Sequence, residues 1–392
     1  MVAGSEPAPN PRLTTDLGLI EARYREGHLW LEARLGLRTN SNLNLSPESR
    51  SVIYKIDLKT MKSRYSMFSP AIPTLSNQPR FWASLPRTFE VLGSHVYVSW
   101  RDQLLATPVE LGDWTPVQVP VAAQSRLFGI GRRLYLAAPD RLLEYDPASK
   151  ETRVMASTRR RPPETELDSL PNFASPGFLK GNTDGSIVHV LLGNTVHPWN
   201  VASGTWGASI RLADRGTPEV MDMVEDGAVL RSQAMGMATR KMFRLSPGRA
   251  VELIIHEAPG VPGMMAETPR SRVKPAGRWS VPDHIDPLVM PLALEPGRVW
   301  MLNNRRFLAG PQQEPGLVIY DDRWPDPVVL RLLFNRANPF PVNETQMMGA
   351  RPQLVATPDG LVLTGRLWNG FWFIPRADLE TAIAQAREKM AK

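Results

Sequence analysis

The stretch that predicts the fold is Leu127 to Met155, LFGIGRRLYLAAPDRLLEYDPASKETRVM. Its short apolar runs are separated by a Gly-Arg-Arg turn, a Pro-Asp turn and an Asp-Pro-Ala-Ser-Lys turn. Short runs of this kind, bounded by turn residues, are typical of β-strands. The stretch therefore predicts four strands of one meandering antiparallel sheet. A sheet of this size cannot bury both of its faces alone, so it needs neighbouring sheets of the same kind.

The same strand rhythm recurs along the chain and predicts further sheets. Together they are expected within residues 17–68, 81–119, 127–155, 177–212, 220–256, 292–334 and 353–375. Each contains one turn that serves as an equivalent point, at Asp57, Pro108, Asp146, Asn200, Ser246, Asp321 and Pro375. These points lie about 40 to 55 residues apart once the insert Glu257 to Pro287 is left out, which is typical of propeller blades. The expected fold is all-β, a β-propeller of seven four-stranded blades, with six or eight blades as the alternatives.

The two ends of the chain are expected to differ from the blades. A mobile N-terminal segment is predicted at residues 1–16, the propeller at 17–376 and a short amphipathic helix at 377–392. The last predicted sheet lacks a fourth strand, so a strand before or around Leu17 is expected to complete it.

The C-terminal helix is predicted from its capping residue and its apolar stripe. Asp378 is the expected N-cap. Apolar residues follow at helical spacing, at Leu379, Ile383, Ala386 and Met390. We expect the helix to pack on the propeller's own surface, with a docking or linker helix as the alternative.

Two turns carry a resemblance to a known class of propellers. The segments Trp199-Asn-Val-Ala-Ser-Gly-Thr-Trp206 and Tyr145-Asp-Pro-Ala-Ser-Lys150 resemble the strand-turn-strand segments of quinoprotein-like, YVTN-type repeats. The Gly-His and Trp-Asp pair of WD40 blades and the Gly-Gly doublet of kelch blades are absent from the repeats. The resemblance implies membership of the propeller superfamily, and it carries over no catalytic residue.

Composition limits the classes of function. The chain of 392 residues is 42% hydrophobic and 22% charged, which is ordinary for a folded globular protein. It has no cysteine, which excludes disulfides, thiolate metal sites and cysteine nucleophiles. The net charge of +7 comes mainly from arginines spread along the chain, with one dense run at Arg159, Arg160 and Arg161. This spread does not favour nucleic-acid binding, which usually concentrates basic residues on one face.

The distribution of apolar residues along the chain bears on membrane spans and on localisation. The first residues lack the pattern of a signal peptide, and no window is apolar enough to span a membrane. We therefore expect a monomer without a membrane span, cytoplasmic by default and extracytoplasmic if the chain is a trimmed mature form.

Two small groups of residues could carry chemistry. Asp283, His284 and Asp286 lie close together in the Pro-rich insert, where they could bind a divalent cation or act as acid and base; a solvated turn is the alternative. His189 and His197 lie on neighbouring predicted strands and could bind a metal together, although histidines in strands are more often structural. No cofactor is predicted.

The remaining candidates are binding residues on loops. Among eleven tryptophans, Trp279 and Trp324 fall in probable loops, where aromatic side chains suit sugar stacking or protein contacts; packing between blades is the alternative. The run Arg159 to Arg161 is a further candidate. Four long loops are expected to form a recognition surface on one face of the ring: Arg38 to Arg50, Arg159 to Pro176, Glu257 to Pro287, which should contain no strand, and Asn303 to Pro315.

These observations favour a non-enzymatic propeller that binds a protein or a polar or carbohydrate ligand through its loops. The alternative is a propeller lyase or hydrolase that acts on a carbohydrate or another polar substrate, with or without a metal.

Overall fold

The computed structural model describes most of the strands and the C-terminal helix. Apart from short gaps at turns, the described residues are 15–37, 50–68, 89–119, 125–157, 179–211, 218–257, 272–274, 292–303, 316–332, 353–364 and 371–391. The chain divides into two compact units. The first unit comprises Met1–Gln124 and Phe334–Gln385, and the second comprises Ser125–Leu333 and Ala386–Lys392.

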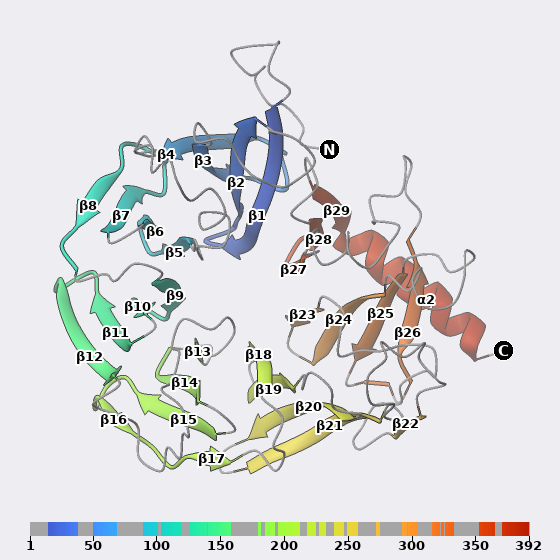
Figure 1. The fold of residues 1–392 in the computed structure, drawn as a ribbon. Helices are drawn as coiled ribbons and strands as arrows, with labels where there is room; N and C mark the ends of the chain where they lie inside the picture. Colours follow the sequence, from blue (N-terminus) through green and yellow to red (C-terminus); the bar gives the residue numbers. More distant parts are fainter. Residues whose placement is uncertain are drawn as a thin grey trace. The chain divides into compact units, whose positions relative to one another are not determined.

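The first unit contains three antiparallel sheets among its described residues (Figure 1). Sheet 1 consists of β1 (Thr15–Arg25), β2 (His28–Leu37), β3 (Arg50–Ile56) and β4 (Ser63–Phe68). Sheet 2 consists of β5 (Phe89–Leu92), β6 (His95–Trp100), β7 (Gln103–Pro108) and β8 (Thr115–Val117). Sheet 7 consists of β27 (Gln353–Thr357), β28 (Gly360–Thr364) and β29 (Phe371–Pro375), and helix α2 (Arg376–Met390) follows it directly.

The second unit contains four antiparallel sheets in its described part. Sheet 3 consists of β9 (Arg126–Ile130), β10 (Arg133–Ala137), β11 (Arg141–Asp146) and β12 (Glu151–Ser157). Sheet 4 consists of β13 (Leu179–Gly181), β14 (Ile187–Leu192), β15 (Thr195–Asn200), β16 (Thr205–Trp206) and β17 (Ile210–Arg211). Sheet 5 consists of β18 (Pro218–Val224), β19 (Gly227–Ser232), β20 (Thr239–Ser246), β21 (Arg249–Glu257) and β22 (Arg272–Lys274). Sheet 6 consists of β23 (Leu292–Glu295), β24 (Arg298–Asn303), β25 (Gly316–Asp321) and β26 (Val328–Arg331).

The first strands of each sheet follow one another in a meander, as the sequence predicts, and in sheet 4 the additional strand β17 pairs with β15. Apolar side chains fill the space between neighbouring sheets of the same unit. Between sheets 3 and 4 the buried residues include Tyr135, Met155 and Trp199. Within each unit the first strands of the sheets also lie beside one another, since β1 contacts β27, and β13 contacts both β9 and β18. The protein is therefore mostly β, and its repeated antiparallel sheets are consistent with a propeller.

Polar side chains at the end of the third strand shape the recurring turn. Asp57 Oδ1 accepts a hydrogen bond from the Lys59 amide at 2.8 Å, and Asp146 Oδ1 accepts one from the Ala148 amide at 2.9 Å. The same kind of contact is made by Asn200 to Ser203 and by Asp321 to Arg323. These side chains satisfy backbone donors that the turn would otherwise leave exposed. The turn equivalence predicted from the sequence is therefore confirmed at these four positions.

Three details of the fold differ from the sequence-based expectations. Strand β1 pairs with β2, so the segment around Leu17 belongs to sheet 1 and does not complete sheet 7. Residues 1–14, the other place expected for that strand, lie outside the described residues. Strand β22 lies within the Pro-rich insert and pairs with β21, because Arg272–Lys274 carries no proline and can donate to the ladder.

The third difference concerns helix α2, which begins at Arg376 and therefore places Asp378 within its first turn. An acidic residue there still favours the helix through the helix dipole. Leu379 and Ile383 are buried, which confirms that the helix packs on the protein itself. Met390, in contrast, is 56% exposed, so the buried stripe is shorter than expected.

Candidate functional site

The two ends of each sheet differ in how they connect the strands. We call the turn end the end where the first strand joins the second and the third joins the fourth, as at Glu26 and Gly27 in sheet 1. We call the loop end the opposite end, where the second strand joins the third, as at residues 38–49 in sheet 1, and where the fourth strand leaves the sheet. Because antiparallel strands alternate in direction, every connection in a meander falls at one of these two ends.

Connections at the loop end vary greatly in length. In sheet 2, Trp100 pairs directly with Gln103, and in sheet 4, Leu192 pairs with Thr195, so two residues suffice to join these strands. In sheet 6, Asn303 pairs with Gly316, so residues 304–315 all lie between two paired positions. In sheet 1, residues 36–49 lie between Leu35 and its partner Arg50. The predicted long loops therefore leave their sheets at the loop end.

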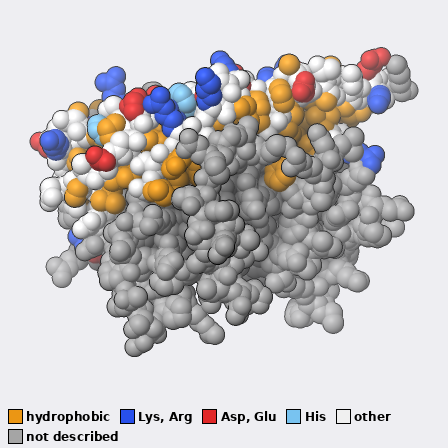
Figure 2. Space-filling model, turned by 90° about the horizontal axis from the view of Figure 1, so that it is seen from above, with side chains coloured by type: hydrophobic (Ala, Val, Ile, Leu, Met, Phe, Trp, Pro, Cys, Tyr) orange, Lys and Arg blue, Asp and Glu red, His pale blue; other side chains and the backbone are white. Residues whose placement is uncertain are grey.

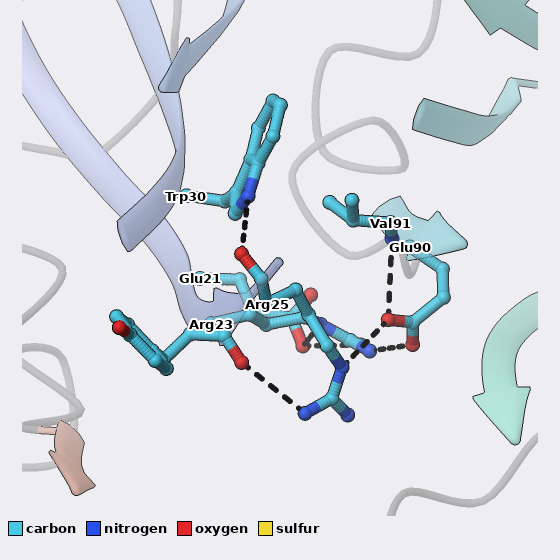
Figure 3. A network of polar contacts seen from close by, with 7 residues as sticks. Glu21, Arg23, Arg25, Trp30, Glu90 and Val91 are labelled. Carbon is cyan, nitrogen blue, oxygen red and sulfur yellow. Dashed lines mark hydrogen bonds and ion pairs between the residues drawn. The ribbon is translucent and has the colours of Figure 1, made fainter. Parts of the chain in front are cut away.

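A buried carboxylate joins sheets 1 and 2 at their first strands (Figure 3). Glu90 of β5 is 1% exposed, and its carboxylate accepts a hydrogen bond from the Arg23 guanidinium of β1. Arg25 Nε lies 3.5 Å from the same carboxylate. Arg23 also donates to Glu21 Oε1 at 2.7 Å through Nη2. Two arginines of one sheet thus converge on one acid of the next.

The charges of this network hold one another in place. Burial by itself would lower the pKa of Arg23, but the carboxylates of Glu21 and Glu90 raise it further above its already high ordinary value. The Arg23 side chain is 17% exposed and works as a fixed cation between the two sheets. Arg25 is 49% exposed and can still meet solvent or a ligand.

A second buried carboxylate joins sheets 3 and 4. Glu144 of β11 is 1% exposed and accepts hydrogen bonds from Arg133 at 2.9 Å, Tyr135 at 3.3 Å and the Trp199 indole at 3.2 Å. Burial, followed by the charge of Glu144, raises the pKa of Tyr135 well above its usual range. Tyr135 is therefore a neutral hydrogen-bond donor to Glu144 at neutral pH. The network ties β10, β11 and β15 together.

A third acid, Asp321, lies at the turn end of sheet 6. Its carboxylate accepts hydrogen bonds from Arg298 at 2.9 Å and from Arg323 at 2.8 and 2.6 Å. Burial raises the pKa of Asp321, but the hydrogen bonds from both arginines outweigh it and bring the pKa to about 2. An aspartate in this state is a weak base, so it acts as a fixed anion that orders the turn.

The structure places His189 and His197 on opposite faces of sheet 4. His189 pairs with Pro198 and His197 pairs with Val190, and neighbouring residues of a strand point to opposite faces. The structure therefore does not support a metal site shared by the two imidazoles. His197 is fully buried, with Nδ1 2.9 Å from Ser209 Oγ, and burial lowers its pKa to about 4. Burial also lowers the pKa of His189.

Most other predicted site residues lie outside the described part of the chain. These are Arg159, Arg160, Arg161, Trp279, Asp283, His284 and Asp286. Trp324 is described: it is half-buried and lies beside Arg323 and Arg387. In the ranges that the structure covers, no three His, Asp or Glu side chains come together as a metal site, and no helix is long and apolar enough to cross a membrane.

The arginines on the described surface are spread out. Figure 2 shows Lys and Arg side chains dispersed among acidic and hydrophobic side chains on the face that it presents. This agrees with the even spread of arginine along the sequence.

The turn between the first and second strands of several sheets contains a recurring glycine that the prediction from sequence did not take into account. A glycine with positive φ lies in this turn in several sheets, for example Gly27, Gly131 and Gly297. In sheets 1, 2, 3 and 6 the second strand then starts with a histidine or an arginine. This residue lies opposite the residue that ends the third strand and begins the recurring turn, as His95 lies opposite Pro108 and Arg298 opposite Asp321. In sheets 3 and 6 the pair is ionic, Arg133 with Asp146 and Arg298 with Asp321. Aligning the seven segments on these glycines would have revealed both pairs.

Two solved structures with low sequence identity are similar in fold to parts of this chain. No protein-family model matches the sequence, and no curated protein is significantly similar to it. Among solved structures, hydrazine synthase of Kuenenia stuttgartiensis is 14% identical with a TM-score of 0.42, covering 71% of this chain and 72% of that chain. The extracellular domain of a one-component system from B. thetaiotaomicron is 12% identical with a TM-score of 0.47, covering 92% of this chain and 38% of that chain.

Proposed function

We propose that the protein is a seven-bladed β-propeller that binds a protein or a polar ligand through its loop end and catalyses no reaction on it. Each of the seven sheets would form one blade. Support for the ring comes from the recurring strand-turn pattern and from the first strands, which lie side by side within each unit.

The observation that carries the binding proposal is the difference in length between equivalent connections. In sheets 2 and 4, two residues lie between the last paired positions of the second and third strands, whereas in sheets 1 and 6 residues 36–49 and 304–315 lie between them. A meander of this kind does not require such length, because the equivalent strands of sheets 2 and 4 are joined by two residues. Long loops that a fold does not require are usually functional, and loops on a rigid scaffold are where recognition is usually placed.

The buried ion networks support the same proposal. Glu90 and Glu144 each hold two neighbouring sheets of one unit together, and Asp321 orders a turn. Their partners are arginine, tyrosine and tryptophan donors of the protein itself. These contacts hold the strands that flank the loops together, and loops on such a scaffold are where recognition is usually placed.

The test replaces each long loop by a two-residue turn. Residues 304–315 are replaced by Asn-Gly, which favours the turn that joins directly paired strands, and residues 36–49 are replaced in the same way in a second variant. The control places Asn-Gly at residues 101–102, where the loop end already has a two-residue turn. We expect all three variants to keep their melting temperature within a few degrees.

Binding is measured on an oligosaccharide array and by capture of proteins from a cell lysate. The proposal predicts a bound glycan or protein that is lost from at least one shortened variant and retained by the control. It fails if the shortened variants do not fold, because the loops would then be structural. It also fails if they fold and retain every ligand of the intact protein.

A further inference from the structure

The outer strand of sheet 4 is interrupted in its middle. β16 pairs with residues 199–200 of β15, and β17 pairs with residues 195–196 of the same strand. Between these pairs, residues 207–209 lie opposite residues 197–198, so the outer strand carries one residue more than β15. An extra residue of this kind forms a bulge, where the ladder of hydrogen bonds is disrupted.

Two contacts hold this bulge against β15. The Gly207 amide donates a hydrogen bond to the Pro198 carbonyl at 2.8 Å. Proline has no N–H, so Pro198 donates no hydrogen bond in return. The second contact joins two side chains, with His197 Nδ1 2.9 Å from Ser209 Oγ. Because the backbone ladder is incomplete here, the outer strand depends on the His197 side chain.

The surroundings of His197 suit a neutral imidazole. The side chain is fully buried, and its Nε2 has no hydrogen-bond partner among the described residues. A neutral imidazole can donate from Nδ1 to Ser209 and keep Nε2 unprotonated, whereas the charged form carries an N–H on both nitrogens. A second proton would therefore bury both an unpaired donor and a charge, which costs free energy. In agreement with this, burial lowers the pKa of His197 to about 4.

The charged groups of sheet 3 do not compensate a second proton. His197 lies on the face of β15 that packs against sheet 3, whose buried acid Glu144 already accepts three hydrogen bonds. The other charged residues on this face of sheet 3 are Arg126, Arg133, Asp146, Glu151 and Arg153. Of the two acids among them, Asp146 pairs with Arg133 at 3.5 Å and Glu151 is exposed.

Sheet 4 itself offers no acid to His197 in its described part. Arg211 of β17 is a cation, and Lys180 of β13 and His189 of β14 are paired positions on the other face of the sheet. Of residues 207–209, the first two are exposed and the third is half-buried. The bulge therefore lies between His197 and the solvent that a charged imidazole requires.

We propose that residues 205–211 form a pH-sensitive flap, which leaves β15 when His197 takes up a second proton in acid. The inner strands stay folded, because β13, β14 and β15 pair with one another and pack on sheet 3. Release of the flap exposes the His197 imidazole and one edge of β15 to water, and it removes the contact of β17 with β21 of sheet 5. The flap is separate from the long loops, so this inference goes beyond the proposed function.

The test is amide hydrogen exchange followed by mass spectrometry at about pH 7.5 and about pH 5. Rates are divided by those of the unfolded peptide at the same pH to give protection factors. In the open flap His197 titrates at its ordinary pKa of 6.5, so protection of residues 205–211 should fall about 30-fold between the two pH values. Urea below the unfolding transition should leave this protection unchanged, whereas that of residues 133–146 should fall, because local opening exposes little surface.

Three variants isolate the role of the imidazole. His197→Phe should reduce the pH effect to less than about threefold, and His197→Gln serves the same purpose if phenylalanine does not fit. His189→Gln is the matched control, since it removes the histidine on the other face of the same sheet and should keep the 30-fold effect. Ser209→Ala should lower the protection about fivefold at both pH values through the lost hydrogen bond.

The flap is refuted if residues 205–211 show the same dependence on urea as residues 133–146, because they would then exchange only when the whole unit unfolds. It is also refuted if the pH effect survives the removal of His197, or if His189→Gln abolishes it equally. Unchanged protection in Ser209→Ala would show that the contact with His197 does not hold the strand, which overturns the proposed device.

Discussion

Protonation of His197 should destabilise the second unit at acidic pH. The side chain is fully buried on β15, against Ser209 and the Trp206 ring. Burial lowers the pKa of His197 from an ordinary 6.5 to about 4. Because the folded state has the lower pKa, the neutral imidazole contributes stability above about pH 6.5, and this contribution is lost as the pH falls from 6.5 towards 4.

The size of the effect follows from the two pKa values. The complete loss, reached below about pH 4, corresponds to about 3 kcal/mol of unfolding free energy. Between about pH 7.5 and about pH 5, His197 becomes protonated in most unfolded molecules but in few folded ones. The free energy of unfolding therefore falls by about 2 kcal/mol over this range. Carboxylates also titrate in this range, so the contribution of His197 must be isolated by comparing two proteins at both pH values.

Urea unfolding followed by circular dichroism gives that comparison. The change His197→Phe keeps a ring of similar size and removes the titrating group. We expect the variant to lose about 2 kcal/mol less than the wild type between about pH 7.5 and about pH 5. His95→Gln is the control, because the His95 side chain is exposed on the surface, and it should behave as the wild type. If His197→Phe shows the same pH dependence as the wild type, the reasoning from burial is refuted.

Three further predictions concern stability. Glu90→Gln should lower the free energy of unfolding, measured by urea titration, by about 3 kcal/mol, because it removes a buried charge from between two arginines. Glu21→Gln, at a more exposed carboxylate, should lower it clearly less, and equal losses would contradict the network. Asp146→Ala should cost about 1 kcal/mol through the lost hydrogen bond to the Ala148 amide, and a change below a few tenths would show that the turn does not depend on it. Deleting 379–392 should lower the melting temperature less than deleting 353–375, because Val362 and Phe371 of sheet 7 pack with Leu29 and Leu31 of sheet 1; comparable losses would count against this.

Much of the strand order could be predicted because the signals are local. Alternating apolar residues and turn residues act within one hairpin, and the side chains of Asp57, Asp146 and Asn200 bond the backbone of their own turns. The prediction was less accurate where the turn position holds a residue, such as proline, whose side chain cannot accept a hydrogen bond from the backbone. At Pro375 the chain enters helix α2 in place of a fourth strand.

The candidate sites were less predictable, because they depend on contacts between distant residues. His189 and His197 were expected to approach one another, but a difference of one position in register places them on opposite faces. The Arg387 guanidinium contacts the Trp324 ring, and the apolar pattern of the helix gives no indication of that contact.

The all-β class, the repeated groups of short strands, the recurring turn and the C-terminal helix could all be predicted from the amino-acid sequence alone. Each of these follows from side-chain periodicity and from hydrogen bonds within a few residues. It takes the folded arrangement of the sheets to bring Arg23 and Arg25 to Glu90, Glu144 to Trp199, and Arg387 to the Trp324 ring. Buried charges and stacked rings depend on which sheets become neighbours, and the free energy that selects those neighbours comes from the whole packed core rather than from any one segment.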